Sequence, residues 1–164
     1  MNTFDDERMM QRYVNDYYQE RGYSSDRTTS CKQYDLRLYK NDYSYLVEEK
    51  FNFTDREYKD MIVELIQDAK SGDLGWFYHV KCDRLHWFYC PVDRISRPNV
   101  LYSIDWFYFK DYVFDRMKEW VSMHFNDQGY GLTLNMRVCL ADLVSEGIAN
   151  KYELNQLSLW GKGI

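Results

Sequence analysis

The spacing of hydrophobic residues predicts a chain in which helices and strands alternate. Apolar residues recur at helical spacing in the segments 5–21, 54–72, 104–123 and 139–152. They alternate with polar residues, as in strands, in the segments 34–40, 43–53, 75–83, 84–90 and 131–138. Polar or proline-bounded stretches predict loops at 23–33 and 91–98. This order predicts a single α/β (α+β) domain over residues 1–164, with a mixed central β-sheet flanked by helices.

Glycine and small polar residues mark where several of these elements begin and end. Gly22 follows the first helix at a position that favours a helix C-cap. Asn41 and Asp42 predict a tight turn between the first two strands. Thr54 followed by Glu57 has the spacing of a capping box, which predicts the start of the second helix.

The composition is that of a globular protein and excludes several other classes. The chain has 164 residues and 18% aromatic residues, with only 8 Gly and 2 Pro, which excludes a disordered or collagen-like polymer. No apolar run is long enough to cross a bilayer, and the amino terminus lacks the features of a signal peptide. The cysteines are far apart in the sequence: Cys31, Cys82, Cys90 and Cys139. They predict reduced thiols, and we expect a cytoplasmic protein that does not contact a membrane.

The net charge of −5 argues against a surface that is basic throughout, but it is compatible with a local basic groove. The segment 84–98 is locally basic. The candidates for contacts with nucleic-acid phosphates are Lys81, Arg84, Arg94 and Arg97. A solvated surface loop is the simpler explanation of the same residues.

Two carboxylates are expected to face each other across the first predicted hairpin. If Asn41 and Asp42 form the turn, counting outward along both strands places Asp35 directly opposite Glu48. Their Cβ atoms would then lie about 5 Å apart on one face of the sheet, with Lys50 projecting beside them. A slip of one residue would instead oppose Asp35 to Glu49 and move the apolar residues of one strand to the wrong face.

Opposed like charges destabilise a sheet unless another group neutralises them. A hard divalent cation such as Mg²⁺ or Mn²⁺ does so with oxygen ligands, and a nearby lysine can orient or deprotonate a water molecule. Three segments carry an acidic residue two positions before a lysine: Glu48-Glu49-Lys50, Glu57-Tyr58-Lys59 and Asp68-Ala69-Lys70. The first alone lies on a predicted strand with an acidic partner strand, so the chemistry is assigned to it.

The acidic first helix, the strand that opens with Asp35, and the strand that ends in Glu48-Glu49-Lys50 before a helix resemble the PD-(D/E)xK nuclease superfamily. This resemblance implies a restriction-endonuclease-like fold in which Asp35 and Glu48 bind the metal, aided by the main-chain carbonyl of Glu49. It also implies that Lys50 serves the hydrolytic water and that a glutamate of the first helix completes the site. Glu20 is the best match for that glutamate, and Glu7 is a poorer one.

The resemblance extends over residues 5–117, because the segments 75–90 and 100–117 are similar to the aromatic strand, strand and helix of small nucleases. Two departures weaken it: Tyr34 stands where the motif has a proline, and the middle residue of the triplet is acidic. We therefore expect a nuclease that uses Mg²⁺ or Mn²⁺ to hydrolyse phosphodiester bonds. By analogy with the family, the expected substrate is DNA. A homodimer is possible, and the sequence does not decide the oligomeric state.

Two other interpretations remain. A non-catalytic member of the same fold would bind nucleic acid or protein, and the acidic balance and abundant aromatics favour it. A zinc-binding protein would use His79, Cys82, His86 and Cys90, whose spacing is not that of a standard zinc knuckle. Strand alternation would place His79 and Cys82 on opposite faces, and two buried thiols with two ordinary histidines explain the pattern more simply.

Overall fold

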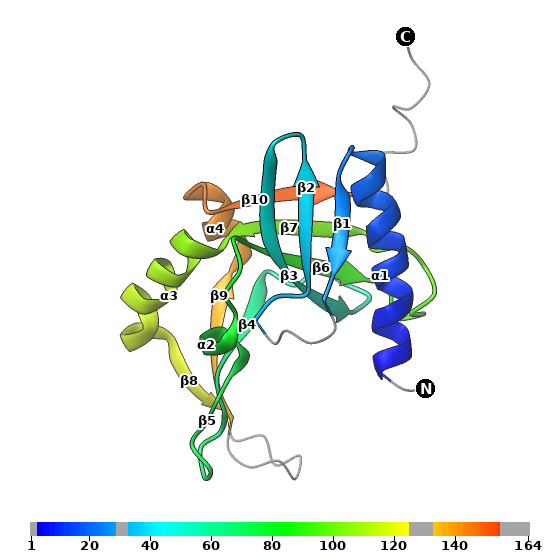
Figure 1. Ribbon diagram of the computed structural model, residues 1–164. Coiled ribbons are helices and arrows are strands. Elements are labelled where there is room, and N and C mark those ends of the chain that lie inside the picture. The colour runs from blue at the N-terminus through cyan, green and yellow to red at the C-terminus, as the bar shows by residue number, and fades with distance from the viewer. Residues whose placement is uncertain (1–2, 29–32, 125–132, 155–164) are drawn as a thin grey trace.

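The computed structural model describes residues 3–28, 33–124 and 133–154 (Figure 1). The helices are α1 (Thr3–Glu20), α2 (Trp76–His79), α3 (Trp106–Trp120) and α4 (Leu140–Ser145). The strands are β1 (Ser24–Arg27), β2 (Leu36–Lys40), β3 (Tyr43–Phe53), β4 (Asp60–Asp68), β5 (Asp73–Leu74), β6 (Arg84–Cys90), β7 (Val100–Asp105), β8 (Val121–His124), β9 (Thr133–Cys139) and β10 (Ala149–Glu153). No described helix has the length and apolarity needed to span a membrane.

The strands form a larger and a smaller sheet. The larger has the order β1-β2-β3-β6-β7-β10, and the smaller has the order β5-β4-β9-β8. Within the larger sheet β3 and β6 run parallel, whereas the other neighbours run antiparallel. The chain is therefore a mixed α+β protein with a mixed central sheet flanked by helices, which confirms the expected fold class.

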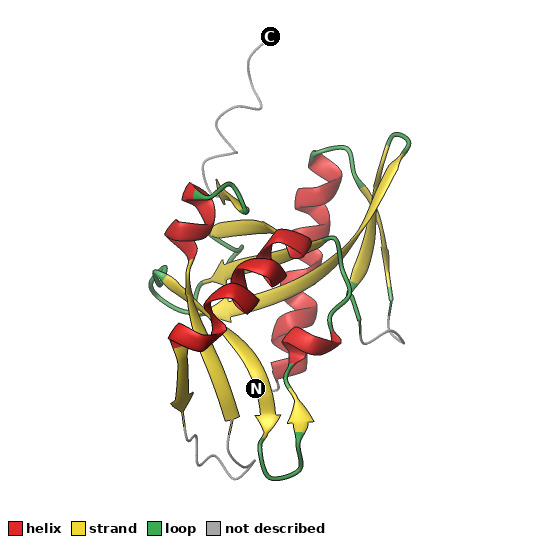
Figure 2. Cartoon of the chain, turned by 90° about the vertical axis from the view of Figure 1, so that its left-hand side faces the viewer, coloured by secondary structure: helices red, strands yellow, loops and turns green. Residues whose placement is uncertain are grey.

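Helix α1 covers one face of the larger sheet because its apolar residues recur at helical spacing. Met10, Val14 and Tyr18 are buried in a core with Leu36 and Leu38 of β2. The other face packs against the smaller sheet, α2 and the helices α3 and α4 in a second core. Figure 2, seen from the side of α3, shows α3 in front and α1 behind, with strands of the sheet between them.

The first hairpin has the register that the alternation of its residues predicts. Lys40 pairs with Tyr43, and Leu36 pairs with Val47. Asn41 adopts φ 54°, the left-handed conformation that a tight turn of this type requires and that asparagine tolerates. Because Leu36 and Val47 are both buried, a slip by one residue would bring a polar side chain into the core.

The predicted helix 54–72 is wrong, since this segment contains strand β4. Met61, Val63 and Leu65 are buried, and Ile62 between them is 51% exposed, which is the period of a strand. Apolar residues at 61, 62, 65 and 66 fit a helical period as well, so the pattern was ambiguous. The Thr54 hydroxyl does not cap a helix but accepts a 3.2 Å hydrogen bond from the backbone N–H of Arg56 in a turn.

The segment 75–83, predicted as a strand, instead contains the short helix α2. Its first residue follows Gly75, at which a Cβ atom would lie 2.2 Å from the carbonyl oxygen of Glu64. Close packing of this backbone on β4 therefore excludes any residue larger than glycine at the position that precedes the helix.

Three further segments also differ from the prediction. The expected loop 23–33 contains β1, the expected helix 104–123 begins after β7 and gives way to β8, and the expected helix 139–152 ends in β10. Strands β1 and β10 are the edges of the larger sheet and have mostly polar sequences, which explains why hydrophobic alternation did not reveal them. The predicted strands 84–90 and 131–138 correspond to β6 and β9.

Candidate functional site

Asp35 lies just before strand β2, beside the part of β3 that continues past it. Its backbone N–H donates a 2.9 Å hydrogen bond to the carbonyl of Val47, the residue that pairs with Leu36 at the end of the hairpin register, so Asp35 lies beside this end of the paired region. Its Oδ2 accepts a 2.7 Å hydrogen bond from the backbone N–H of Glu49. The carboxylate is therefore fixed to the backbone of β3 next to Glu48.

Glu48 and Lys50 project from β3 on the side opposite α1. The Nζ of Lys50 lies 2.6 Å from the Oε1 of Glu48, whose residue is only 6% exposed. Burial raises the pKa of Glu48 to about 7; Lys50 opposes this shift and Asp35 adds to it. Asp35 and Glu48 thus interact as neighbouring carboxyl groups, and this interaction adds to the effect of burial on the pKa of Glu48.

A cavity of about 740 Å³ opens beside this group, between the two sheets and the start of α1. The lining residues come from α1, β3, β4, α2, β6, β9 and the connecting segments: Glu7, Gln11, Asp35, Glu49, Lys50, Phe51, Asn52, Tyr58, Lys59, Asp60, Ile62, Trp76, Trp87 and Arg137. The Nζ of Lys50 lies 5.3 Å from the ring centroid of Trp76. One wall of the cavity therefore carries Asp35 and Lys50, and other parts of its lining carry aromatic and basic side chains.

The two glutamates proposed for the first helix lie at opposite ends of α1. Glu7 lines the cavity together with Asp35 and Lys50. Glu20 is about 20 Å farther along the helix and lines a small separate hollow with Tyr17 and Arg97. The structure therefore brings Glu7 to the candidate site and does not bring Glu20 there.

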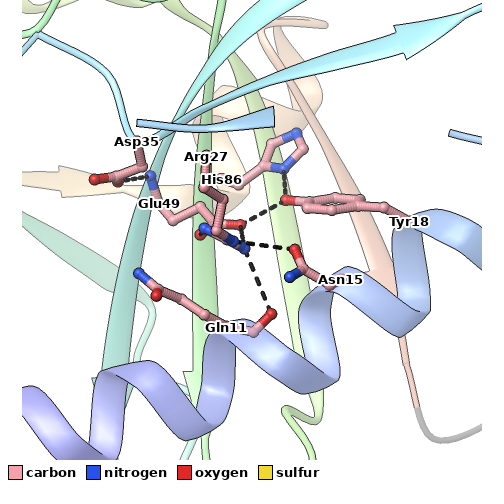
Figure 3. Close-up of polar contacts among 7 residues, drawn as sticks. All are labelled: Gln11, Asn15, Tyr18, Arg27, Asp35, Glu49 and His86. Atoms are coloured by element: carbon pink, nitrogen blue, oxygen red, sulfur yellow. Dashed lines mark hydrogen bonds and ion pairs between the residues drawn. The ribbon is translucent and has the colours of Figure 1, made fainter. Parts of the chain in front are cut away.

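A buried polar network supports the candidate site from the side of α1 (Figure 3). The Glu49 side chain is completely buried, and the Arg27 guanidinium contacts both of its oxygens, at 2.6 Å and 3.2 Å. Arg27 also donates a 3.0 Å hydrogen bond to Asn15 of α1. Burial raises the pKa of Glu49, whereas Arg27 and the hydroxyl of Tyr18 act in the opposite direction by favouring the ionised carboxylate.

The network continues from Glu49 to β7 through hydrogen bonds of defined direction. The Tyr18 hydroxyl donates to Glu49 at 3.0 Å and lies 2.6 Å from Nδ1 of His86. Since that hydroxyl has a single proton, Nδ1 of His86 must be the donor to it, and Nε2 accepts from Ser103 at 3.1 Å. Burial lowers the pKa of His86 to about 3, so this neutral tautomer persists at physiological pH.

Sequence reasoning did not find Arg27, because it lies in a polar segment read as a loop and pairs with a residue that is distant in the sequence. The backbone carbonyl of Glu49 was proposed as a metal ligand, whereas its side chain turns away toward α1. One signal in the sequence did point to a buried partner for Glu49. Glu49 alternates in β3 with Val47 and Phe51, so it occupies a position that faces inward, where a charged residue needs a partner.

The predicted phosphate-binding residues do not form one surface. Lys81 and Arg84 border a hollow near the start of β6, and Arg84 pairs with Asp105 at 3.3 Å. Arg94 and Arg97 follow the end of β6, where they lie over the rings of Phe53 and Tyr13. The two pairs are separated by the length of β6, roughly 20 Å.

The four residues of the zinc alternative are also dispersed. The ring of His79 contacts the carbonyl of Leu74, whereas His86 lies in the network below α1. Cys82, Cys90 and Cys139 are free thiols, and Cys31 lies outside the described residues. Burial raises the pKa of Cys82 and of Cys90, which keeps both thiols protonated.

The donor set of Asp35 and Glu48 suits a hard divalent cation. Both offer carboxylate oxygens. Burial raises the pKa of Glu48 and Asp35 adds to the shift, and a bound cation would favour the ionised form of Glu48 against both effects. Across residues 3–28, 33–124 and 133–154, no three His, Cys, Asp or Glu side chains gather as a metal site. A cation here would therefore take two side-chain ligands and complete its shell with a main-chain carbonyl and water, as Mg²⁺ commonly does.

Comparison with known proteins adds no family to this geometry. No model of a known protein family matches the sequence, and no curated protein matches it significantly.

Proposed function

We propose that the chain is a metal-dependent nuclease of the PD-(D/E)xK type, which hydrolyses phosphodiester bonds in DNA. The observation that carries the proposal is the juxtaposition of Asp35, Glu48 and Lys50 beside the cavity. The order α1-β1-β2-β3 with a crossover to the parallel strand β6 supports it, because this arrangement displays both motif strands side by side.

Each residue has a distinct role in this proposal. Asp35 and Glu48 would hold Mg²⁺ or Mn²⁺ together with the carbonyl of Glu49, and Glu7 replaces Glu20 as the helix α1 glutamate at the site. The bound cation would supply a more acidic water and polarise a phosphoryl oxygen. Lys50 would orient the water that attacks phosphorus, while the bond from phosphorus to the leaving oxygen breaks and that oxygen takes up a proton. Release of Lys50 from Glu48 is then part of assembling the active site.

Mn²⁺-dependent nicking of supercoiled plasmid, together with cleavage of single-stranded and branched oligonucleotides, tests the proposal directly. Asp35→Asn and Lys50→Ala are each expected to lower the nicking rate by about 100-fold or more, with circular dichroism unchanged. Lys70→Ala is the matched control, because Lys70 ends another acidic-x-Lys triplet but lies in an exposed turn after β4. Nicking that survives both site substitutions, or that falls equally with Lys70→Ala, would refute the assignment.

The non-catalytic alternative has one observation in its favour. The Lys50 ammonium lies 2.6 Å from the buried carboxyl of Glu48 and balances its charge without a metal ion. A binding module would keep this ion pair permanently, and calorimetry would then detect no Mn²⁺ binding at Asp35 and Glu48. Binding of Mn²⁺ that is lost in Asp35→Asn would exclude this alternative.

A further inference from the structure

The cavity beside Asp35 is lined by more than the proposed catalytic residues. Tyr58 and Lys59 precede β4, Arg137 lies on β9 opposite Ile62, and Trp76 begins α2. Tyr58 is 54% exposed and Arg137 is also exposed, so both can contact a molecule that enters from solvent. Aromatic rings and cations in one cavity suit a nucleotide, whose base stacks and whose phosphate is anionic.

The size of the cavity limits which nucleic acid can reach Asp35 and Lys50. Its volume of about 740 Å³ lies within the roughly 300–1,000 Å³ typical of sites for single small ligands. One or two nucleotides fit such a space. A continuous duplex does not, because its bases are paired and stacked on their neighbours and none of them can enter a pocket without being unpaired and unstacked.

Resting on the proposed nuclease function, we infer that the cavity receives an unpaired strand, so that the substrate is DNA with a single-stranded segment, not a continuous duplex. A base stacks on Tyr58 and Trp76, and Lys59 and Arg137 contact the adjacent phosphates. Trp76 lies next to Lys50, so a stacked base would bring its own phosphate toward the proposed water-orienting lysine. Stacking is tolerant of sequence, so the preference concerns strand structure and not base identity.

Two exposed residues elsewhere provide matched controls. Tyr43, the first residue of β3, is 78% exposed and does not line the cavity. Arg37, an exposed residue of β2, likewise does not line it. Tyr58→Ala is therefore compared with Tyr43→Ala, and Arg137→Ala with Arg37→Ala. Each pair removes the same chemical group inside and outside the cavity proposed to bind the DNA strand.

Fluorescence anisotropy of the full chain in EDTA, and again in Ca²⁺, measures binding without requiring cleavage. The probes are a labelled single-stranded 20-mer, the blunt duplex of the same sequence, and that duplex with a single-stranded flap. We expect the single strand and the flap to bind at least ten-fold more tightly than the blunt duplex. Tyr58→Ala and Arg137→Ala should each weaken single-strand binding by roughly ten-fold, and the two control variants should not.

Equal affinity for the blunt duplex, equal losses in cavity and control variants, or no binding of any probe would overturn the inference. The result is separable from the fate of the nuclease proposal. Selective single-strand binding without Mn²⁺-dependent cleavage would refute the nuclease and keep the strand site. Nicking that depends on Asp35 and Lys50 but is unchanged by substitution of Tyr58 and Arg137 would support the nuclease and refute the single-strand site.

Discussion

The guanidinium of Arg27, on edge strand β1, pairs with the completely buried carboxylate of Glu49 at 2.6 Å. Strand β2 lies between β1 and β3, so this contact ties the edge of the sheet to the strand that carries Glu48 and Lys50. The backbone N–H of the same Glu49 holds Asp35. One residue thus links the buried network below α1 to the proposed active site on the other side of the strand.

Removal of Arg27 should destabilise the fold strongly. Arg27→Met would leave Glu49 buried without a cation, and we expect the free energy of unfolding in urea to fall by about 3 kcal/mol. Arg84→Met is the control, because its ion pair with Asp105 is partly exposed and should be worth less than about 1 kcal/mol. The additional change Glu49→Gln should restore part of the loss by removing the uncompensated charge. Equal effects of the two arginine substitutions would contradict this account.

Stability in the absence of divalent cations should decline as the pH rises through neutrality. The pKa of Glu48 is raised to about 7 in the folded state, above the ordinary value of a glutamate, so the folded state binds the proton more tightly than the unfolded state. The resulting stabilisation is complete below about pH 4.5 and is lost as the pH approaches 7. Because Glu48 is coupled to Asp35 and Lys50, we expect a change of no more than roughly 3 kcal/mol.

Urea unfolding at a series of pH values in EDTA, with the difference between wild type and Glu48→Gln taken at each pH, isolates this contribution. The difference should change in favour of the variant as the pH rises from 5 to 8. Saturating Mn²⁺ should weaken the dependence, since a cation at this carboxyl favours its ionised form. A difference that stays flat over this range would show that Glu48 titrates normally.

The register of the first hairpin was predictable, whereas the network behind it was not. Leu36 and Val47 alternate with polar neighbours, and a short turn fixes which residues pair, so the pairing of Leu36 with Val47 followed from local sequence alone. The contact between Arg27 and Glu49 joins residues brought together by an edge strand whose sequence, SSDR, has no apolar residue to reveal it. Hydrophobic periodicity indicates which apolar residues are buried, but it does not indicate which distant residue pairs with a buried charge.

The segment 54–72 was wrongly predicted as a helix for a related reason. The residues from Met61 to Ile66 satisfy helical and strand periods equally, and the pairing of β4 with β9, which is distant in the sequence, decides between them. This difference matters for function. A helix would have covered the larger sheet, whereas β4 brings Ile62 to the cavity and follows directly on Tyr58 and Lys59.

Asp35→Asn should separate stability from activity. The substitution removes the like-charge repulsion with Glu48, and an amide oxygen can still accept the hydrogen bond from the backbone of Glu49. In EDTA we therefore expect the free energy of unfolding to stay equal or to rise by about 1 kcal/mol, while nicking is lost. The check is urea unfolding of the two proteins in parallel at pH 8, above the pKa of about 7 of Glu48. A loss of several kcal/mol would mean that Asp35 has a structural role.

The helix glutamates give the clearest comparison between the two ends of α1. Glu7 lines the cavity with Asp35, whereas Glu20 borders a separate hollow about 20 Å farther along the helix. Glu7→Gln should therefore reduce the rate of Mn²⁺-dependent nicking by about ten-fold or more, because it removes a negative charge next to the proposed cation. Glu20→Gln should leave the rate unchanged, although the sequence motif alone favoured it. The same change at two positions of one helix controls for helix stability, which thermal unfolding of both variants should show to be equal. A larger loss of nicking in Glu20→Gln would place the active site at the other end of α1 and refute the role of the cavity.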